Sequence, residues 1–231
     1  MALPDTKERP NSDIEKAYWL LRQEILAGRL APGEKLRIDH LRTTYNFGVS
    51  AIREALSRLL SDGLVDSVSQ RGFWVAQISR QDLKAITNAR TLIEVEALRQ
   101  SIAHGDIGWE SRVVAARHAL ERVEVTLTKK SADAVITWEN ANRNFHMELI
   151  SACPTKHLLR FTEQLYDQSL RYRYRTKQRR AFPRSGLSKD HEELLQCTLK
   201  RDAKRACELL TEHINRIALI AEIAIFGEET A

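Results

Sequence analysis

The sequence has few of the features that mark secreted or membrane-bound chains. It contains only three cysteines, Cys153, Cys197 and Cys207, and no CxxC motif, which argues against a disulfide framework. The N-terminus lacks the apolar segment of a signal peptide, and no stretch approaches the roughly 20 apolar residues of a membrane-spanning helix. We therefore expect a protein of the reducing cytoplasm that does not contact a membrane.

Motifs of the common enzyme classes are also missing. There is no HExxH arrangement, no nucleophile motif and no glycine-rich loop that could cradle a phosphate. Neither an internal repeat nor a low-complexity segment is present, although residues 1–12 are polar, contain prolines and are expected to be disordered. The missing motifs argue against an enzyme.

Residues 41–75 have the pattern of a winged helix-turn-helix, a DNA-reading fold. A short polar helix and a turn precede a second helix from Ser50 to Leu60, and a hairpin closed by Arg71 and Gly72 follows. Alternation over residues 64–68 and 73–75 predicts two strands, with residues 69–72 as the wing tip.

The helix that starts at Ser50 has one packing face and one free face. Its apolar residues at positions 52, 55, 56, 59 and 60 fall on one side, whereas Ser50, Arg53, Ser57 and Ser61 fall on the other. We expect Ser50 to cap the helix, whose unpaired N–H groups suit a phosphate. Periodicity alone is equally typical of an ordinary packed helix with surface arginines.

The surrounding motifs resemble the GntR family of bacterial transcription regulators. Three motifs carry the resemblance: Leu26-Ala-Gly-Arg-Leu-Ala-Pro-Gly-Glu-Lys-Leu36, Arg53-Glu-Ala-Leu56 and Asp62-Gly-Leu-Val65. The first helix has its own signals, since a Ser12-x-x-Glu15 capping box starts it and Gly28 ends it, and Pro32-Gly33 turns the chain into a short strand near Leu36. The resemblance implies ligand-responsive, sequence-specific binding of double-stranded operator DNA, and we expect a repressor.

The resemblance also places the DNA contacts, because Arg53 matches the arginine that opens the family's Arg-Glu-Ala-Leu motif. The predicted DNA-binding residues are Arg37, Thr44, Ser50, Arg53, Ser57, Arg58, Gln70, Arg71 and Gly72. Two departures matter: the family often has an arginine where this chain has Val49, and a serine or threonine where it has Gly48. Specificity should therefore depend more on Arg53, the wing and the geometry of a dimer.

The distribution of charge predicts that a single copy binds DNA weakly. The whole chain carries a net charge of +5, which suits a polyanionic partner, but residues 1–78 hold 11 Lys and Arg against 10 Asp and Glu. Each phosphate that a protein neutralises adds to its affinity through the release of counterions. We therefore predict a homodimer on a palindromic operator.

From Gln81 onward the pattern changes from strands to helices. We predict helices at about 81–104, 109–129, 132–151, 155–180, 188–200 and 202–225, with breaks at glycines, at prolines and at Asp202, which should cap the last helix. Pro183 and Gly186 should precede the fifth of these. The expected fold is mainly α, with a disordered tail at 1–12, a winged helix-turn-helix domain at 13–78 and an antiparallel helical bundle at 79–231.

The helical half resembles the FCD ligand-sensing domain of the FadR-type branch of the family. Within this branch the chain is most similar to the carbon-starvation-induced, glutarate-responsive regulators. The segments that suggest this are residues 88–94, 97–103, 104–106, 109–110, 165–168 and 171–173. The resemblance covers nearly the whole chain and implies that residues 79–231 bind an effector and form the dimer.

Asn142 and His146 are candidate metal ligands because they lie four residues apart on one face of a helix. His191, expected in the first turn of the fifth bundle helix, and His213 could meet them in the bundle interior. Such pairs also arise by chance, and histidines on helices more often have no metal. However, FCD domains have Asp or Asn, a His four residues later, a His in an Asp/Glu-His step, and a His in the last helix. Asn142, His146, His191 after Asp190, and His213 match this pattern.

The resemblance thus implies a divalent metal ion, and three imidazoles favour zinc, with nickel, iron and manganese as alternatives. Asn142 departs from the commoner carboxylate, and its neutral amide leaves the charge of the ion uncompensated. Such a site should attract a small carboxylate or dicarboxylate effector. The other histidines, His40, His104, His118 and His157, are interpreted as structural or solvent-facing.

Three further residues are candidate effector contacts. Arg90 matches an arginine that the family often turns toward the ligand, although an ion pair with Glu94 one turn later is the alternative. Residues 171–184 contain no acidic residue and could bind nucleic acid or form a solvated helix end. We expect Arg171 or Tyr172 to reach the pocket and the other basic residues of this segment to lie on the surface.

Two other functions stay open at this point. Three histidines around an ion also hold catalytic zinc, so a metal-dependent hydrolase or lyase is one alternative. A structural protein that compacts DNA is another, but it would not need a buried polar pocket, and the nearly neutral DNA-reading half argues against it. A DNA-reading module joined to a pocket favours a ligand-responsive regulator.

Overall fold

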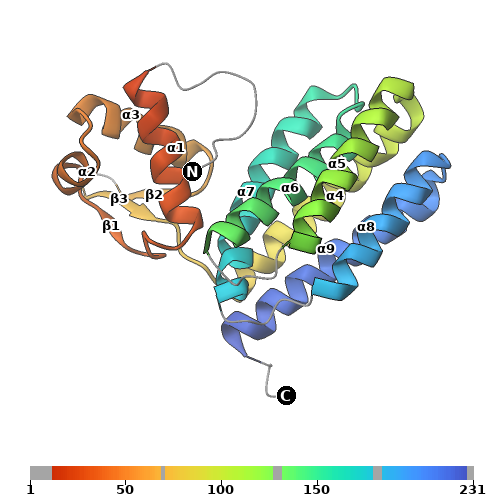
Figure 1. Cartoon of the computed structure of the whole chain (residues 1–231). Coiled ribbons are helices and arrows are strands. Elements are labelled where there is room, and N and C mark those ends of the chain that lie inside the picture. Colours follow the sequence, from red (N-terminus) through yellow and green to blue (C-terminus); the bar gives the residue numbers. More distant parts are fainter. Residues whose placement is uncertain (1–11, 69–70, 127–131, 179–183, 228–231) are drawn as a thin grey trace. The chain divides into compact units, whose positions relative to one another are not determined.

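The computed structural model describes residues 12–68, 71–126, 132–178 and 184–227 (Figure 1). It is mostly helical with one small antiparallel sheet, which confirms the predicted fold class. The chain divides into two compact units. The N-terminal unit comprises residues 1–79 and the segment Asp167–Arg175, and the helical unit comprises Arg80–Tyr166 and Thr176–Ala231.

The N-terminal unit is a helix-turn-helix with a three-stranded sheet. Its elements are α1 (Asp13–Leu26), β1 (Lys35–Leu36), α2 (Ile38–Tyr45), α3 (Val49–Ser61), β2 (Val65–Val68) and β3 (Gly72–Val75). The strand order is β1-β3-β2, and both pairings are antiparallel, with Leu36 opposite Phe73 and Val65 opposite Val75. The predicted wing is therefore the β2–β3 hairpin, although Ser69 and Gln70 at its tip lie outside the described residues.

The capping box at the start of α1 is confirmed. The Glu15 backbone N–H donates to Ser12 Oγ at 3.2 Å, and the Ser12 N–H donates to the Glu15 carboxylate at 3.4 Å. These bonds satisfy two of the N–H groups that a helix start leaves without partners. At the other end, the chain leaves the helix through Gly28, whose φ of +74° suits a residue without a Cβ.

We expect Ser12→Ala to lower the free energy of unfolding by about 1 kcal/mol, because the N-terminus of α1 loses its side-chain acceptor. Urea denaturation measures this change. Ser111→Ala is a matched control, since Ser111 is also exposed but bonds a carbonyl inside a helix. An unchanged urea midpoint in Ser12→Ala would show that the capping box contributes nothing to stability.

Helix α3 differs in two ways from its prediction. It begins at Val49 with Gly48 as the N-cap, so Ser50 lies inside the first turn and does not cap the helix. The reason is the short turn before it: Asn46 ends α2 in the left-handed conformation, and only Phe47 and Gly48 join the two helices. In addition, Leu60 is 40% exposed, because it lies about 100° around the helix from the buried Leu59.

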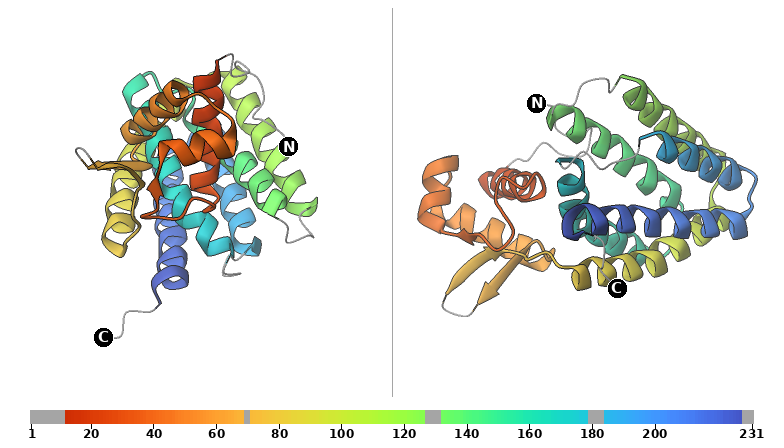
Figure 2. Two further views of the ribbon diagram at one scale, coloured as in Figure 1. Left: turned by 90° about the vertical axis from the view of Figure 1, so that its left-hand side faces the viewer. Right: turned by 90° about the horizontal axis from the view of Figure 1, so that it is seen from below.

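The described residues from Arg80 onward form six helices, as predicted, and the segment Asp167–Arg175 of the fourth belongs to the N-terminal unit. They are α4 (Arg80–His104), α5 (Ile107–Thr126), α6 (Ala132–Ile150), α7 (Lys156–Gln178), α8 (Arg184–Leu199) and α9 (Ala203–Phe226). Helix α4 packs against α9, and α5 packs against both α6 and α8, while α8 and α9 lie side by side (Figure 2). Asp202 caps α9, as expected, by accepting the Arg205 N–H at 3.1 Å.

The fifth helix of this unit starts earlier than predicted. Because α8 begins at Arg184, Gly186 lies inside the helix and does not precede it. A glycine inside a helix costs only about 1 kcal/mol relative to alanine, which the packing of a helix readily outweighs. His191 therefore lies in the third turn of α8, deeper in the helix than the predicted first turn.

The helices of this unit enclose an apolar core with polar residues at its centre. Trp109, Phe145, Leu98 and Leu120 are among the fully buried apolar side chains. His191 is buried beside them, and Phe145 contacts its ring edge to face. Among the residues that the structure describes, no helix is both long enough and apolar enough to cross a membrane.

Candidate metal centre and DNA-reading surface

Three buried imidazoles from three helices meet inside the helical unit. His146 lies on α6, His191 on α8 and His213 on α9, and one ring nitrogen from each lies within 4.8 Å of the others. Their ring centroids are 4.9 to 5.4 Å apart. The structure thus brings together the three histidines that the sequence pattern selected, whereas the remaining four are exposed: His40, His104, His118 and His157.

Asn142 lies next to this cluster, one turn before His146 on α6. Its side chain is fully buried, and its Nδ2 donates to the Tyr166 hydroxyl at 2.7 Å. Its Oδ1 has no hydrogen-bond partner within the described part of the chain. A buried amide oxygen without a partner is costly in a folded protein unless it binds a water molecule or an ion. Asn142 therefore has a buried oxygen available to a ligand, one helical turn from His146.

His191 has the most unusual environment of the three. It is completely buried, and neither ring nitrogen makes a hydrogen bond to another described residue. Burial lowers the pKa of His191 to about 3, because the charged form loses its hydration. The ring is therefore neutral and keeps a lone pair for coordination. A metal ion would satisfy both this imidazole and the Asn142 oxygen, so the residues present fit a metal ion.

Two carboxylates lie next to the imidazoles: Glu124 has no place in the sequence pattern, and Asp190 enters it only as the residue before His191. Asp190 Oδ2 lies 3.2 Å from His213 Nδ1 and also pairs with Arg216. Glu124 Oε1, on α5, lies 3.7 Å from His191 Nδ1. Each carboxylate also pairs with an arginine, Asp190 with Arg216 and Glu124 with Arg117, so the expected uncompensated charge of the ion stays a prediction.

Arg90 lies close to the cluster but has a partner. Its Nε donates to Glu94 Oε1 at 2.6 Å, and both side chains are buried, so the ion pair that was the alternative interpretation is present. The guanidinium also lies over the Tyr166 ring, 5.0 Å from its centroid. Tyr166 contacts Asn142, so Arg90 is one residue removed from the candidate metal ligands. Its role as an effector contact stays a prediction.

Arg171 and Tyr172 have contacts in the N-terminal unit. Arg171 donates to the carbonyl oxygens of Ala76 and Gln77, and the Tyr172 hydroxyl pairs with the Ser79 backbone. These bonds fit a structural role, and an effector contact for either residue remains untested. The other basic residues of segment 171–184 were predicted to lie on the surface. This prediction is wrong for Arg173, which is buried.

The predicted DNA contacts form an exposed set in the N-terminal unit. Those that the structure describes are all exposed: Arg37, Thr44, Ser50, Arg53, Ser57, Arg58, Arg71 and Gly72. Gln70 lies outside the described residues. Arg58 is partly engaged, since its Nε lies 3.7 Å from the Glu54 carboxylate. Arg53 lies one turn from the N-terminus of α3, beside the exposed Val49 and Ser50, which suits it to contact a phosphate or a base.

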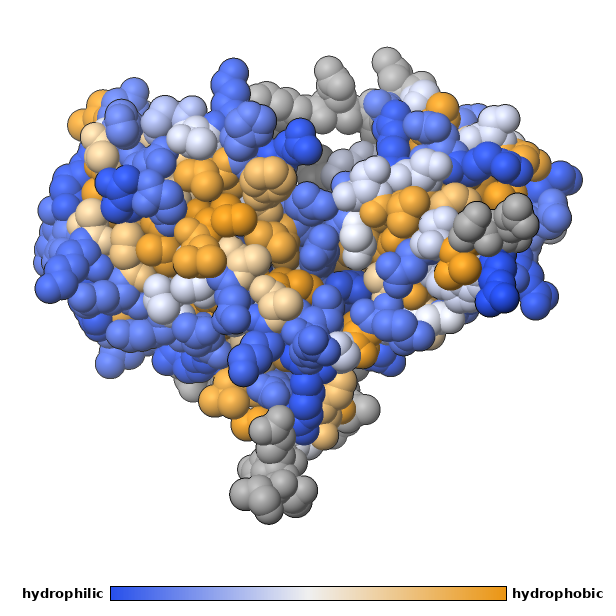
Figure 3. Space-filling model, turned by 180° about the vertical axis from the view of Figure 1, so that it is seen from behind, coloured by the Kyte–Doolittle hydropathy of each residue, from blue (hydrophilic) through white to orange (hydrophobic). Residues whose placement is uncertain are grey.

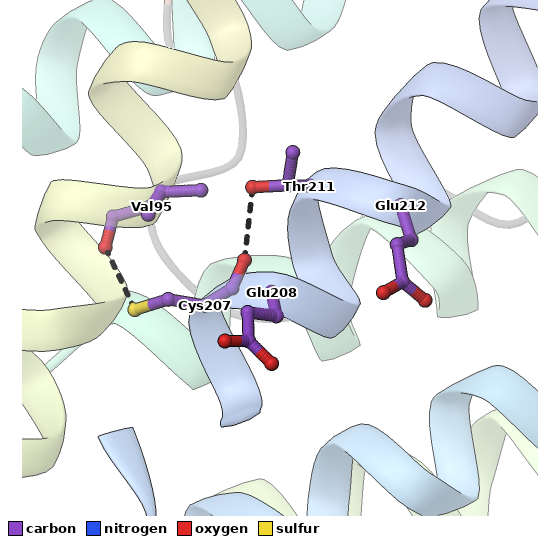
Figure 4. A pocket seen from close by; sticks show the side chains of 5 residues that line it. All are labelled: Val95, Cys207, Glu208, Thr211 and Glu212. Atoms are coloured by element: carbon purple, nitrogen blue, oxygen red, sulfur yellow. Dashed lines mark hydrogen bonds between the residues drawn. The ribbon is translucent and has the colours of Figure 1, made fainter. Parts of the chain in front are cut away.

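A surface hollow of about 350 Å³ lies between α4 and α9, and none of the three clustered histidines lines it (Figure 4). The Cys207 thiol donates to the Val95 carbonyl at 3.7 Å, and the Thr211 hydroxyl donates to the Cys207 carbonyl at 2.9 Å. Burial raises the pKa of the Cys207 thiol, so this cysteine is a poor nucleophile. The hollow has the chemistry of ordinary helix packing.

Comparison with protein families decides the interpretation of both units. The model of the bacterial regulatory proteins of the gntR family matches residues 13–75, and the FCD domain model matches residues 85–216. The chain belongs to the GntR family. With its FCD domain it falls in the FadR-type branch. Because the relatives of this GntR protein are transcription regulators, the alternative of a metal-dependent hydrolase or lyase is wrong.

Two curated relatives and one solved structure support this assignment. The GntR protein is 40% identical over 214 residues to the uncharacterized HTH-type transcriptional regulator BphR of Paraburkholderia xenovorans LB400, covering 93% of this chain and 86% of the relative. It is 34% identical to the HTH-type transcriptional repressor GlaR of Escherichia coli K12, covering 91% and 96% of the two chains. The structure of E. coli McbR/YncC has the same fold, with a TM-score of 0.74, 20% identity and coverage of 91% and 98%.

Proposed function

We propose that this GntR-family regulator is a repressor whose operator binding is controlled by a small carboxylate or dicarboxylate at a metal ion in the FCD domain. The observation that carries the proposal is the meeting of His146, His191 and His213, with the unpartnered oxygen of Asn142 one helical turn from His146. The ligands come from α6, α8 and α9, so occupancy of the site would act on the relative positions of three helices.

The ligand set favours zinc, because imidazole nitrogens suit this ion and zinc can expand from four to five ligands when a carboxylate binds. Nickel, iron or manganese would also accept three imidazoles and one amide oxygen. When bound, the metal ion supplies positive charge and coordination positions for a carboxylate oxygen. Asn142, His146, His191 and His213 would hold it, and Arg90 would contact the effector from the side of Tyr166.

The DNA-reading surface is proposed to be the exposed edge of α3 together with the wing. Arg53 would reach a base edge or a phosphate, and Arg71 would contact the DNA groove beside the wing. Ser50 and Ser57 would bind the sugar-phosphate backbone of the DNA. The N-terminus of α3 adds unpaired N–H groups for a phosphate, although Gly48 and not Ser50 precedes it.

A homodimer on a two-fold operator completes the proposal. The winged helix domain has almost no net positive charge, so two copies are needed for firm binding. Apolar side chains gather on part of the surface in Figure 3. On the helical unit, Leu92 of α4 is 75% exposed and Phe161 of α7 is 42% exposed. Large exposed apolar side chains of this kind suit contact with a second copy of the chain.

We expect Leu92→Glu to convert the dimer into a monomer, because a charged side chain would replace an apolar contact in the subunit interface. Size-exclusion chromatography with light scattering measures the mass. Val125→Glu is the control, since Val125 is similarly exposed but lies on α5. Equal masses for Leu92→Glu and the unaltered protein at micromolar concentration would remove α4 from the interface.

The proposed control by an acid can be tested on DNA that the protein itself selects from a random pool. The fluorescence anisotropy of the labelled fragment reports binding of the zinc-loaded protein. It is followed during titration with glutarate or succinate, and glutaramide serves as the uncharged control. We expect an acid to lower the affinity for DNA and glutaramide to have no effect. If neither acid changes the DNA affinity of the zinc-loaded protein, the proposal is contradicted.

A further inference from the structure

We infer that Glu124, held by Arg117 and Ser188, is a positioning residue that orients the imidazole of His191 for metal binding. The inference rests on the proposed metal site and adds an outer layer of residues to it. These residues come from α5 and α8, and none belongs to the sequence pattern that selected the four candidate ligands.

The contact between Glu124 and His191 joins two groups that both need a partner. Glu124 Oε1 is buried without a hydrogen bond to another described residue, and His191 Nδ1 lies 3.7 Å away in the same condition. A shift of less than 1 Å would make this a hydrogen bond of ordinary length. With Nδ1 facing Glu124, the Nε2 atom of His191 remains for coordination.

Arg117 fixes the position of Glu124. Its buried guanidinium places Nη1 3.5 Å from Glu124 Oε2, and Nη2 donates to the Ser188 hydroxyl at 3.1 Å and to the Ser188 carbonyl at 3.3 Å. Its Nε lies 3.7 Å from Glu192. Ser188 and Glu192 flank His191 on α8, so a single arginine ties α5 to the turn of helix that carries this ligand.

His213 has a matching arrangement. Asp190 contacts His213 Nδ1, and Arg216 pairs with Asp190, so a carboxylate backed by an arginine again stands behind an imidazole. A carboxylate at the second nitrogen of a metal-binding histidine sets its tautomer and orientation and makes it a stronger ligand. Two of the three imidazoles therefore have the same kind of support, although the carboxylates come from different helices.

The test compares the zinc affinity of the unaltered protein with that of Glu124→Gln, by competition with a chelator in the full-length chain. Loss of an outer carboxylate of this kind should weaken binding about 10- to 100-fold. The control is Glu121→Gln, since Glu121 lies on the same helix but is exposed. The absorption spectrum of the cobalt-loaded protein should also change for Glu124→Gln and not for the control.

The outcomes separate this inference from the proposed function. An unaltered protein that binds no zinc would overturn the metal site itself. Tight zinc binding that is equal in the unaltered protein and in Glu124→Gln would overturn only the role of Glu124. A variant that lowers the stability of the metal-free protein without changing zinc affinity would show a structural role. If Glu124→Gln does not fold, Arg117→Lys replaces it, and an unchanged affinity and cobalt spectrum would again contradict the inference.

Discussion

A His213→Ala variant should still bind operator DNA but should no longer respond to a carboxylate. His213 belongs to the helical unit, whereas the DNA contacts lie in the N-terminal unit, so the substitution leaves the reading surface intact. In the unaltered protein the acid should change operator affinity about 5- to 150-fold, the usual range for coupling between two sites. In the variant the ratio of affinities with and without the acid should be near one.

His118→Ala is the matched control, because His118 is an exposed histidine in the same unit. It should keep the full response. Thermal unfolding and circular dichroism of each metal-free protein establish that the variants fold, and His146→Ala serves as a second variant at the site. An acid response of normal size in both site variants would exclude the three histidines from effector control.

The Arg53→Ala variant should lose most of its operator affinity. A base or phosphate contact of this kind contributes about 1–3 kcal/mol in each half-site. Because a dimer uses the contact twice, the expected loss is roughly 2–6 kcal/mol, or about 30-fold to more than 10,000-fold. Val49 strengthens this expectation, since no arginine at that position can take over the contact.

Anisotropy titrations at several salt concentrations measure the effect and show its origin. If Arg53 reads a base, Arg53→Ala should relax the preference for operator over unrelated DNA. If Arg53 binds a phosphate, the substitution should lower both affinities and reduce the salt dependence. The control is Arg99→Ala, since Arg99 is an exposed arginine of the helical unit that pairs with Glu96. Unchanged operator affinity in Arg53→Ala would remove α3 from the proposed reading surface.

Much of the N-terminal unit could be predicted from local signals. The Ser12–Glu15 capping box and Gly28 act within a few residues, so the sequence is enough to locate them. The start of α3 was misplaced because Ser50 is a better capping residue than Gly48 by type. The left-handed conformation of Asn46 shortens the turn and so sets the start of the helix. This conformation is visible only in the structure.

Part of the candidate site could be predicted from helical spacing and from the family pattern. Asn142 and His146 are one turn apart, and the family pattern selected His191 and His213. Glu124 and Arg117 escaped detection because they reach His191 from a helix that is distant in sequence, and neither has a neighbouring motif. Arg173 was misplaced for a similar reason, since a basic segment resembles a solvated helix end until its packing is known.

The most direct test of the central claim is an X-ray structure of protein purified without chelators, with anomalous data collected on both sides of the absorption edges of zinc and nickel. The account predicts one anomalous peak per chain, with His146, His191 and His213 nitrogens and the Asn142 oxygen around it at roughly 2.0–2.2 Å. Absence of a peak among these residues, in protein supplied with zinc, would contradict the proposed metal centre and the control of operator binding built on it.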